Sequence, residues 1–446
     1  MGSLRRTLTF RDLIVYGLLF IAPMAPVGIF GTLEARSHGA VTLVYLVATV
    51  AMAFTAYSYA QMVRVAPQAG SVYTYARVGL GEGPGFVAGW MAMLDYLLIP
   101  AVAYLFCGIA LHALVPSVPA WVWTALAVVV TTLLNLWGVR TAARVGFAVL
   151  AMEIAVLVVF VVAAVWALAA HGAVRGWAEP FTGEGGFSMG AVLSAVSVAV
   201  LSYLGFDAIA SFAEEAAGGA RRVARAVLAC LVVAGVLFAV QTYLAALLAP
   251  MSAAELAVRP GEQGNAFYAT ADAAVGGWLQ KLVAAGKAIG AAFAALAGQA
   301  AAGRLLFAMA RDRRLPGAMA EVDEGSGVPR RALLGAALVT LVAAVWAARR
   351  DDGLDQLSSI VNVGALTAFA LLHASVIGWF LVRRRGGKPG VLRHGVVPLL
   401  GLVVVVAVVV SASPTAQVVG AVWCAVGLAV LAVQYGARAR AGGTGA

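Results

Sequence analysis

The amino-acid sequence predicts an all-α polytopic membrane protein, and three observations support that prediction. Of the 446 residues, 63% are hydrophobic and 11% are charged, and the mean hydropathy is +0.94. A helix needs about 20 apolar residues to cross a bilayer, and apolar runs of that length recur along the whole chain. The runs are continuous, whereas the strands of a membrane barrel would alternate over about 10 residues. Soluble domains of this length do not have such a composition.

The sequence does not indicate an enzyme. It contains no His-Glu-x-x-His motif, the usual signature of a catalytic zinc site. Cys107, Cys230 and Cys424 lie in separate apolar stretches, so neither a disulfide framework nor a metal site is expected. We expect no catalytic residue, no metal and no cofactor other than a coupling proton or sodium ion. We also expect no cleaved signal peptide, because prolines break the first apolar segment and no small-residue cleavage site follows it.

We expect about twelve spans in a single transporter domain over 1–446, with boundaries approximate to a few residues. The first repeat would cover 12–170, the second 187–382, and two extra helices would lie within 396–437. The Gly-rich tail at 438–446 is expected to be disordered. The expected spans are 12–32, 41–64, 85–114, 120–136, 142–170, 187–213, 224–249, 277–310, 331–346, 357–382, 396–411 and 416–435.

The positive charges predict the orientation. If both termini are cytoplasmic, the inner loops and inner span ends hold 23 of the 30 lysines and arginines. The outer loops then hold five, and Lys281 and Lys287 fall in the eighth span. Membrane proteins keep an excess of lysine and arginine on the cytoplasmic side. We therefore expect a multi-pass protein of the cytoplasmic membrane whose basic residues set its topology and do not bind nucleic acid.

Two of the expected spans are interrupted. The first contains Pro23-Met24-Ala25-Pro26-Val27-Gly28, and the sixth contains Ser202-Tyr203-Leu204-Gly205-Phe206-Asp207. Proline removes an amide donor and clashes with the preceding turn, and glycine lets a helix unwind. The breaks lie about five spans apart, so the two halves would have opposite orientations, as in transporters with inverted repeats. Each break could instead be a packing kink.

The two breaks predict a substrate site. Carbonyls freed in the first break could coordinate a cation or a substrate ammonium, and the amides of Gly28 and Ile29 would begin a half-helix whose positive end favours a carboxylate. The same reasoning applies around 203–205, where neighbouring aromatic rings could act as gates. The expected substrate-binding residues are Ala25, Pro26, Val27, Gly28, Ser202, Tyr203, Leu204, Gly205, Phe206 and Tyr96.

Charged and amide side chains within the spans are further candidates, because intramembrane charges usually face a cavity or a partner. Glu153 lies about 16 Å into the fifth span. It could carry a proton, bind sodium, pair with a substrate amine or form a structural ion pair, and we expect it to couple transport to the ion. Lys287 could pair with a carboxylate, contact an anionic substrate group or extend to the outer surface. Asp95, Asp207 and Asn362 are auxiliary candidates; Asp207 could serve gating or packing, and Asn362 could bond two helices.

Several motifs together resemble those of the amino acid–polyamine–organocation permeases, over about residues 8 to 437. The motifs are Gly28-Ile29-Phe30, Ala66-Pro67-Gln68-Ala69-Gly70-Ser71-Val72-Tyr73, Leu204-Gly205-Phe206-Asp207 with Glu214-Glu215, and Arg304-Leu305-Leu306-Phe307-Ala308-Met309-Ala310-Arg311-Asp312 followed by Leu315-Pro316. Two more, Leu94-Asp95-Tyr96-Leu97 and Trp121-Val122-Trp123, resemble the putrescine-importer-like branch.

The resemblance implies a LeuT-type five-plus-five inverted repeat with two extra helices, alternating access, and uptake of a small amine or amino acid, often with a proton. The sequence departs from the family pattern at two positions. Pro26 stands where many members have a glycine whose amide binds a substrate carboxylate, which favours an amine. Glu153 stands where some proton-coupled members have a lysine, which leaves the coupling ion open. Lys287 argues against a dicationic amine as the substrate, because its charge would repel one.

We therefore expect a secondary active permease that imports amino acids or related small amines by alternating access, coupled to a proton. The alternatives are a polyamine or putrescine importer or exchanger, and a sodium-coupled symporter. A non-transporting amine receptor would need an output domain, and a channel would need a continuous polar stripe. The expected partners are the small amine or amino acid and the lipid bilayer, and the sequence leaves the oligomeric state open.

Overall fold

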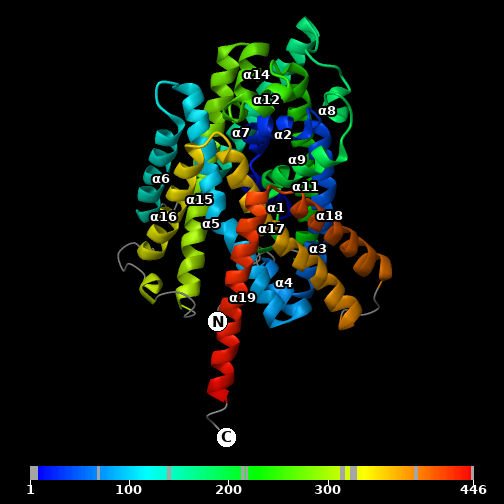
Figure 1. The fold of residues 1–446 in the computed structure, drawn as a ribbon, viewed down its shortest axis with the longest axis vertical. Coiled ribbons are helices and arrows are strands. Elements are labelled where there is room, and N and C mark those ends of the chain that lie inside the picture. The colour runs from blue at the N-terminus through cyan, green and yellow to red at the C-terminus, as the bar shows by residue number, and fades with distance from the viewer. Residues whose placement is uncertain are drawn as a thin grey trace.

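The structure is a computed structural model that describes residues 9–67, 71–137, 142–211, 216, 219–311, 317–321, 329–385 and 390–442. Every secondary-structure element in these residues is a helix, and Figure 1 shows the helices gathered into one bundle. The all-α prediction is therefore confirmed. The motif residues at 68–70, 212–215, 312 and 315–316 lie outside the described part of the chain.

The described helices account for the expected spans. Nine of them are long and apolar enough to cross a membrane, a bent pair makes a tenth, and two shorter apolar helices cover 120–136 and 189–203. The spans are formed by α1 (Phe10–Ile21) with α2 (Ala25–Ser37), α3 (Val41–Val65), α5 (Glu82–Leu114), α6 (Ala120–Leu136), α7 (Ala142–His171), α9 (Met189–Ala199) with η1 (Val200–Tyr203) and α10 (Ala208–Ser211), α11 (Gly219–Leu248), α15 (Gly277–Arg311), α16 (Arg330–Ala348), α17 (Gly353–Ile377), α18 (Val397–Val410) and α19 (Pro414–Gly442).

Short helices that the sequence did not predict connect these spans. They are α4 (Ser71–Leu80), α8 (Glu179–Thr182), α12 (Ala253–Val258), α13 (Pro260–Gln263), α14 (Ala266–Ala274) and η3 (Gly317–Ala320), with π-helical turns η4 (Gly378–Val382) and η5 (Leu392–Val396) at two span ends. The last helix continues to Gly442, so it enters the segment 438–446 for which disorder was expected. Residues 443–446 lie outside the described residues.

The first span breaks between α1 and α2, which are bent by 49°. Ala22 ends α1 with φ 59, a left-handed conformation that few residues other than glycine adopt. The half-helix then begins at Ala25, not at Gly28 as the sequence analysis expected. The reason is the place of Pro26 in the first turn of α2, where amides have no partner within the helix and a missing donor costs nothing.

The sixth span breaks at residues 204–207, between η1 and α10. Leu204 is extended, with φ −58 and ψ 134, and Gly205 has φ +110. The pieces of the two broken spans pair with each other: α1 packs on α10, and α2 packs on α9. This pairing of corresponding pieces is what an inverted repeat would produce, although the five-plus-five repeat itself stays a prediction.

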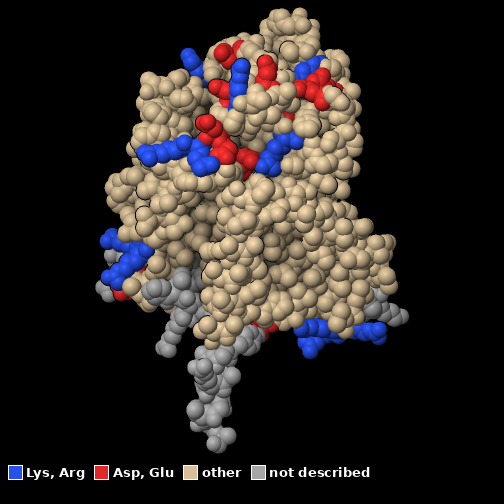
Figure 2. Space-filling model, in the orientation of Figure 1, with Lys and Arg blue, Asp and Glu red and all other residues tan. Residues whose placement is uncertain are grey.

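The bundle has two different ends. In Figure 1, α4 lies at the lower end, and α8, α12 and α14 lie at the upper end. Figure 2 shows a broad uncharged surface between them, with basic residues below it and a mixture of acidic and basic residues above it. A wide uncharged belt of this kind suits contact with lipid. We refer below to the α4 end and the α12 end.

The glycine at the sixth-span break has no room for a side chain. A Cβ at Gly205 would lie 2.9 Å from the backbone oxygen of Phe20, in addition to the strain of its positive φ. We expect Gly205→Ala to destabilise the protein by about 1–3 kcal/mol, measured as a lower melting temperature of the purified protein in detergent. Gly190→Ala is the matched control, because Gly190 lies in α9 with open space around it and alanine favours a helix by up to about 1 kcal/mol. Equal melting temperatures for the two variants would contradict this account of the break.

Candidate transport site

A cavity of about 330 Å³ lies beside the break of the sixth span. Its walls come from α1, α5, α15 and the turn at 204–207, so it lies on the α1 side of the first-span break. Its lining is mostly apolar and aromatic. The lining residues are Tyr16, Leu19, Phe20, Asp95, Tyr96, Ile99, Pro100, Ala103, Leu204, Gly205, Asp207, Phe293, Ala294, Ala297, Gly298 and Ala301. Five predicted site residues therefore meet in one cavity: Asp95, Tyr96, Leu204, Gly205 and Asp207.

Two carboxylates supply the charge of this cavity. Asp207 accepts long hydrogen bonds of 3.4 Å from the hydroxyl groups of Tyr59 and Ser71. Asp95 has one buried carboxylate oxygen, Oδ1, with no hydrogen-bond partner. Within the described residues, neither carboxylate forms an ion pair with a lysine or arginine. A mostly apolar cavity with two uncompensated carboxylates is suited to bind a cation.

The carbonyls of the first-span break are already occupied. The side-chain amide of Gln241, from α11, donates to the Pro23 carbonyl at 3.0 Å. The ammonium group of Lys287, from α15, donates to the Met24 carbonyl at 3.1 Å. The sequence predicts freed carbonyls at this break that could coordinate a cation or a substrate, whereas in the structure side chains of neighbouring helices donate to these two carbonyls.

The predicted substrate residues of the first span lie away from the cavity described above. Pro26, Val27 and Gly28 are buried and Ala25 is half-buried, and none of the four lines the cavity. A Cβ at Gly28 would lie 2.5 Å from the ring of Phe106, so this glycine permits close packing of α2 on α5. Substrate contact at these four positions stays a prediction.

Lys287 and Glu153 form a buried pair behind the first-span break. The Lys287 ammonium lies 4.6 Å from the centroid of the Phe106 ring, and it interacts electrostatically with Glu153 of α7. The Glu153 carboxylate packs against Gly290, where a Cβ would lie 2.2 Å from Oε1. Both side chains are buried and neither lines the cavity. Lys287 therefore donates to a backbone carbonyl and interacts electrostatically with a carboxylate, and its role in transport stays a prediction. The coupling role of Glu153 stays a prediction.

Ser202 and Tyr203 dock the sixth span on α3 and do not line the cavity. The hydroxyl groups of Tyr45 and Ser202 are 2.9 Å apart. The Tyr203 hydroxyl lies 2.7 Å from that of Thr49 and donates to the Tyr45 carbonyl at 3.1 Å. Because these bonds satisfy the polar groups next to the break, they fix where η1 ends.

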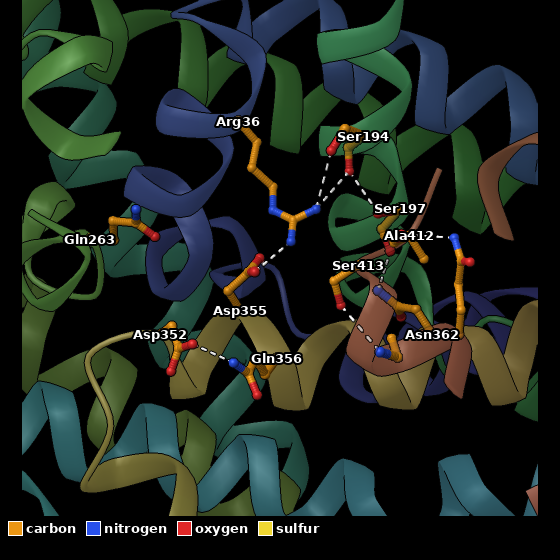
Figure 3. Close-up of polar contacts among 12 residues, drawn as sticks. Arg36, Ser194, Ser197, Gln263, Asp352, Asp355, Gln356, Asn362, Ala412 and Ser413 are labelled. Carbon is orange, nitrogen blue, oxygen red and sulfur yellow. Dashed lines mark hydrogen bonds and ion pairs between the residues drawn. The ribbon is translucent and has the colours of Figure 1, made fainter. Parts of the chain in front are cut away.

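Phe206 and Asn362 also hold the sixth span in place. The Phe206 ring lies 5.8 Å from that of Tyr59 and 6.0 Å from that of Phe369, measured between centroids. The Asn362 side chain donates to the carbonyls of Ser197 and Val198 at 2.7 and 3.0 Å, so it bonds α17 to α9 as the sequence analysis considered. Figure 3 shows Asn362 and Ser197 from these two helices close together.

Ion pairs that were not predicted from the sequence tie helices together at the α12 end. Arg36 of α2 pairs with Asp355 of α17 and donates to the Ser194 hydroxyl of α9 at 3.2 Å, and Figure 3 shows its guanidinium between the two. The broken spans and α17 are therefore tied together on this side. Arg36 was counted only as an outer-loop charge, although its position one helix after the first break could have indicated this role.

A second ion pair strengthens the same end. Arg175, in the loop after α7, pairs with Glu34 at 2.7 Å and with Glu184 at 3.5 Å, and it also bonds the Met251 carbonyl. Burial disfavours the charged form of Arg175, but the two carboxylates outweigh that effect and raise its pKa. Glu34 itself is fully buried in α2, so this arginine neutralises a charge that would otherwise be costly.

Two interrupted spans and a cavity beside one of the breaks define a membrane transporter of the broken-helix class. Comparison with known proteins identifies the family. The amino acid permease family matches residues 13–410, so the chain belongs to that family of transporters, which are not enzymes. The resemblance stated from the motifs is confirmed.

Individual relatives cover nearly the same length of chain. The low-affinity putrescine importer PlaP of Escherichia coli (strain K12) is 29% identical over 96% of this chain and 94% of its own length. The branched-chain amino acid permease BcaP of Lactococcus lactis subsp. cremoris (strain MG1363) is 27% identical over 97% and 95%. The methylthioribose transporter of Bacillus subtilis (strain 168) is 31% identical over 84% and 81%.

The buried pair behind the first-span break gives a stability prediction. Glu153→Gln would leave the Lys287 ammonium buried without a counter-charge, which costs about 3–5 kcal/mol. We expect a clear drop in the melting temperature of the purified variant. The double variant Glu153→Gln with Lys287→Met removes both charges and should recover most of that loss. If the double variant were no more stable than the single one, Glu153 and Lys287 would not be energetically coupled.

Proposed function

We propose that this permease imports a small organic amine, taken up as a cation, across the cytoplasmic membrane by alternating access. The observation that carries the proposal is the pair of carboxylates, Asp95 and Asp207, in one cavity beside the sixth-span break. A primary amine is protonated at neutral pH and would neutralise them. The putrescine importer among the relatives supports an amine, and the 23 basic residues assigned to the cytoplasmic side support an orientation with both termini inside.

The charges argue against a zwitterionic amino acid as the main substrate. A substrate carboxylate would need a cation or free amides near the cavity. Lys287 is held by Met24 and balanced by Glu153, and Pro26 offers no amide. The earlier conflict between Lys287 and a dicationic amine is therefore removed, because a neutralised lysine outside the cavity does not repel the substrate.

We further propose that a proton, not sodium, drives uptake. A sodium ion needs several oxygen ligands, and backbone carbonyls at an unwound helix are a usual source. The Met24 carbonyl already holds the Lys287 ammonium, which supports a site without sodium. Glu153 is the proposed coupling residue, because its Oε1 is buried, has no hydrogen-bond partner and lies next to that ammonium.

The carboxylates give the first test of this function. We expect Asp95→Asn and Asp207→Asn each to weaken putrescine binding at least tenfold, because each loses an ionic contact worth about 1.5–3 kcal/mol. Binding is measured by thermal shift and calorimetry on the purified protein, against a panel of diamines, monoamines and neutral amino acids. Glu82→Gln is the matched control, because Glu82 lies on the same helix as Asp95 but is exposed and outside the cavity. Stabilisation by neutral amino acids and not by amines would overturn the proposed substrate class.

The coupling role of Glu153 gives the second test. In proteoliposomes, the double variant Glu153→Gln with Lys287→Met is expected to exchange substrate across the membrane but not to concentrate it under an imposed proton gradient. The wild type should concentrate substrate under the proton gradient and not under a sodium gradient. If the double variant concentrated substrate at the wild-type rate, Glu153 and Lys287 would have a structural role and no role in coupling.

A further inference from the structure

We propose that the cationic substrate and protons compete for the same two carboxylates, so that binding of the substrate displaces a proton from the cavity. The inference rests on the proposed function, because it requires a substrate that carries positive charge. It concerns Asp95 and Asp207, which line one cavity and lie close enough for their charges to interact. It does not depend on the coupling role proposed for Glu153.

Among the residues that the structure describes, no other charge near the two carboxylates balances them. The titratable groups that interact with them are tyrosines: Tyr59 from α3, Tyr75 from α4 and Tyr96 from α5. From α15 the cavity is lined by a phenylalanine, alanines and a glycine, and from α1 by a tyrosine, a leucine and a phenylalanine. From α17, Gly364 lies against the backbone at Asp95. Within the described residues, the pair therefore has no basic neighbour.

Two negative charges in a mostly apolar cavity are unfavourable when no cation is present. A proton on one carboxylate removes half of that charge, and a bound ammonium group compensates it. Because both meet the same electrostatic need at the same oxygens, each weakens the binding of the other. Such a pair titrates as a unit, with the proton held mainly by one of its members.

The hydrogen bonds indicate which carboxylate holds the proton in the empty cavity. Asp207 accepts from two hydroxyl groups and from the backbone at Gly205, and donors of this kind favour an ionised carboxylate. Asp95 has no such donor for its buried Oδ1. We therefore assign the proton to Asp95 and the standing negative charge to Asp207. When the substrate binds, the proton leaves Asp95 for the solvent and an ammonium group takes its place.

Calorimetry counts the displaced protons directly. Binding of putrescine to the purified full-length protein is measured at one pH in phosphate and in Tris, whose different ionisation enthalpies reveal protons released on binding. We expect about one proton released per putrescine, and a binding constant that weakens by up to tenfold per unit as the pH falls. Asp95→Asn should bind more weakly and release fewer protons, whereas the Glu82→Gln control should match the wild type.

The outcomes separate this inference from the function on which it rests. Putrescine binding without proton release in the wild type would overturn the competition and leave the amine permease intact. Proton release unchanged in Asp95→Asn would overturn the assignment to Asp95. If no member of an amine panel bound while a neutral amino acid did, the proposed function itself would be wrong. The wild-type proton count decides the competition even if Asp95→Asn does not fold.

Discussion

The contact on which the site depends is the one between the Lys287 ammonium and the Met24 carbonyl. The first span has to break, because prolines interrupt it, and a break in the membrane leaves carbonyls without partners. Lys287 donates to the Met24 carbonyl at 3.1 Å, which also accepts from the Val27 amide, and Gln241 donates to the neighbouring Pro23 carbonyl. The charge of Glu153 offsets part of the cost of burying the lysine. Side chains from three other spans, α7, α11 and α15, thus stabilise the break in the first span.

The second break differs from the first because a cavity lies beside it. With the first break filled by side chains, the uncompensated charge of the described site lies in the cavity beside residues 204–207. There Gly205 adopts a positive φ against the backbone of Phe20, which brings the turn close to α1, and Asp207 lines the same cavity as Asp95. The two breaks differ in charge. Behind the first, a buried lysine and a buried glutamate interact electrostatically, whereas the second has two carboxylates with no basic partner among the described residues. A binding site and a separate charged pair can then respond to different ions.

Much of this could be predicted from the sequence. The apolar runs predict the spans, and the prolines and Gly205 predict the two breaks. Both can be predicted because they depend on residues that are neighbours in the sequence. The partners of the broken backbone could not be predicted, since Gln241 and Lys287 are more than 200 residues from Pro23 and Met24. For the same reason, Arg36 and Arg175 were interpreted as topological charges. Asp95 was only an auxiliary candidate, and its importance comes from sharing a cavity with Asp207, a fact of packing and not of spacing.

The two sides of the breaks differ, because one has ion pairs between helices and the other has the cavity. At the α12 end, Arg36 and Arg175 tie α2 to α9, α17 and the loop before α8. The cavity lies on the other side of the breaks, against α1. Opening the α12 end requires α2 to separate from α9 and α17, and α2 begins next to the Met24 carbonyl that Lys287 holds. The same helix therefore carries the ion-pair contacts of the α12 end and, at its start, the carbonyl that holds Lys287.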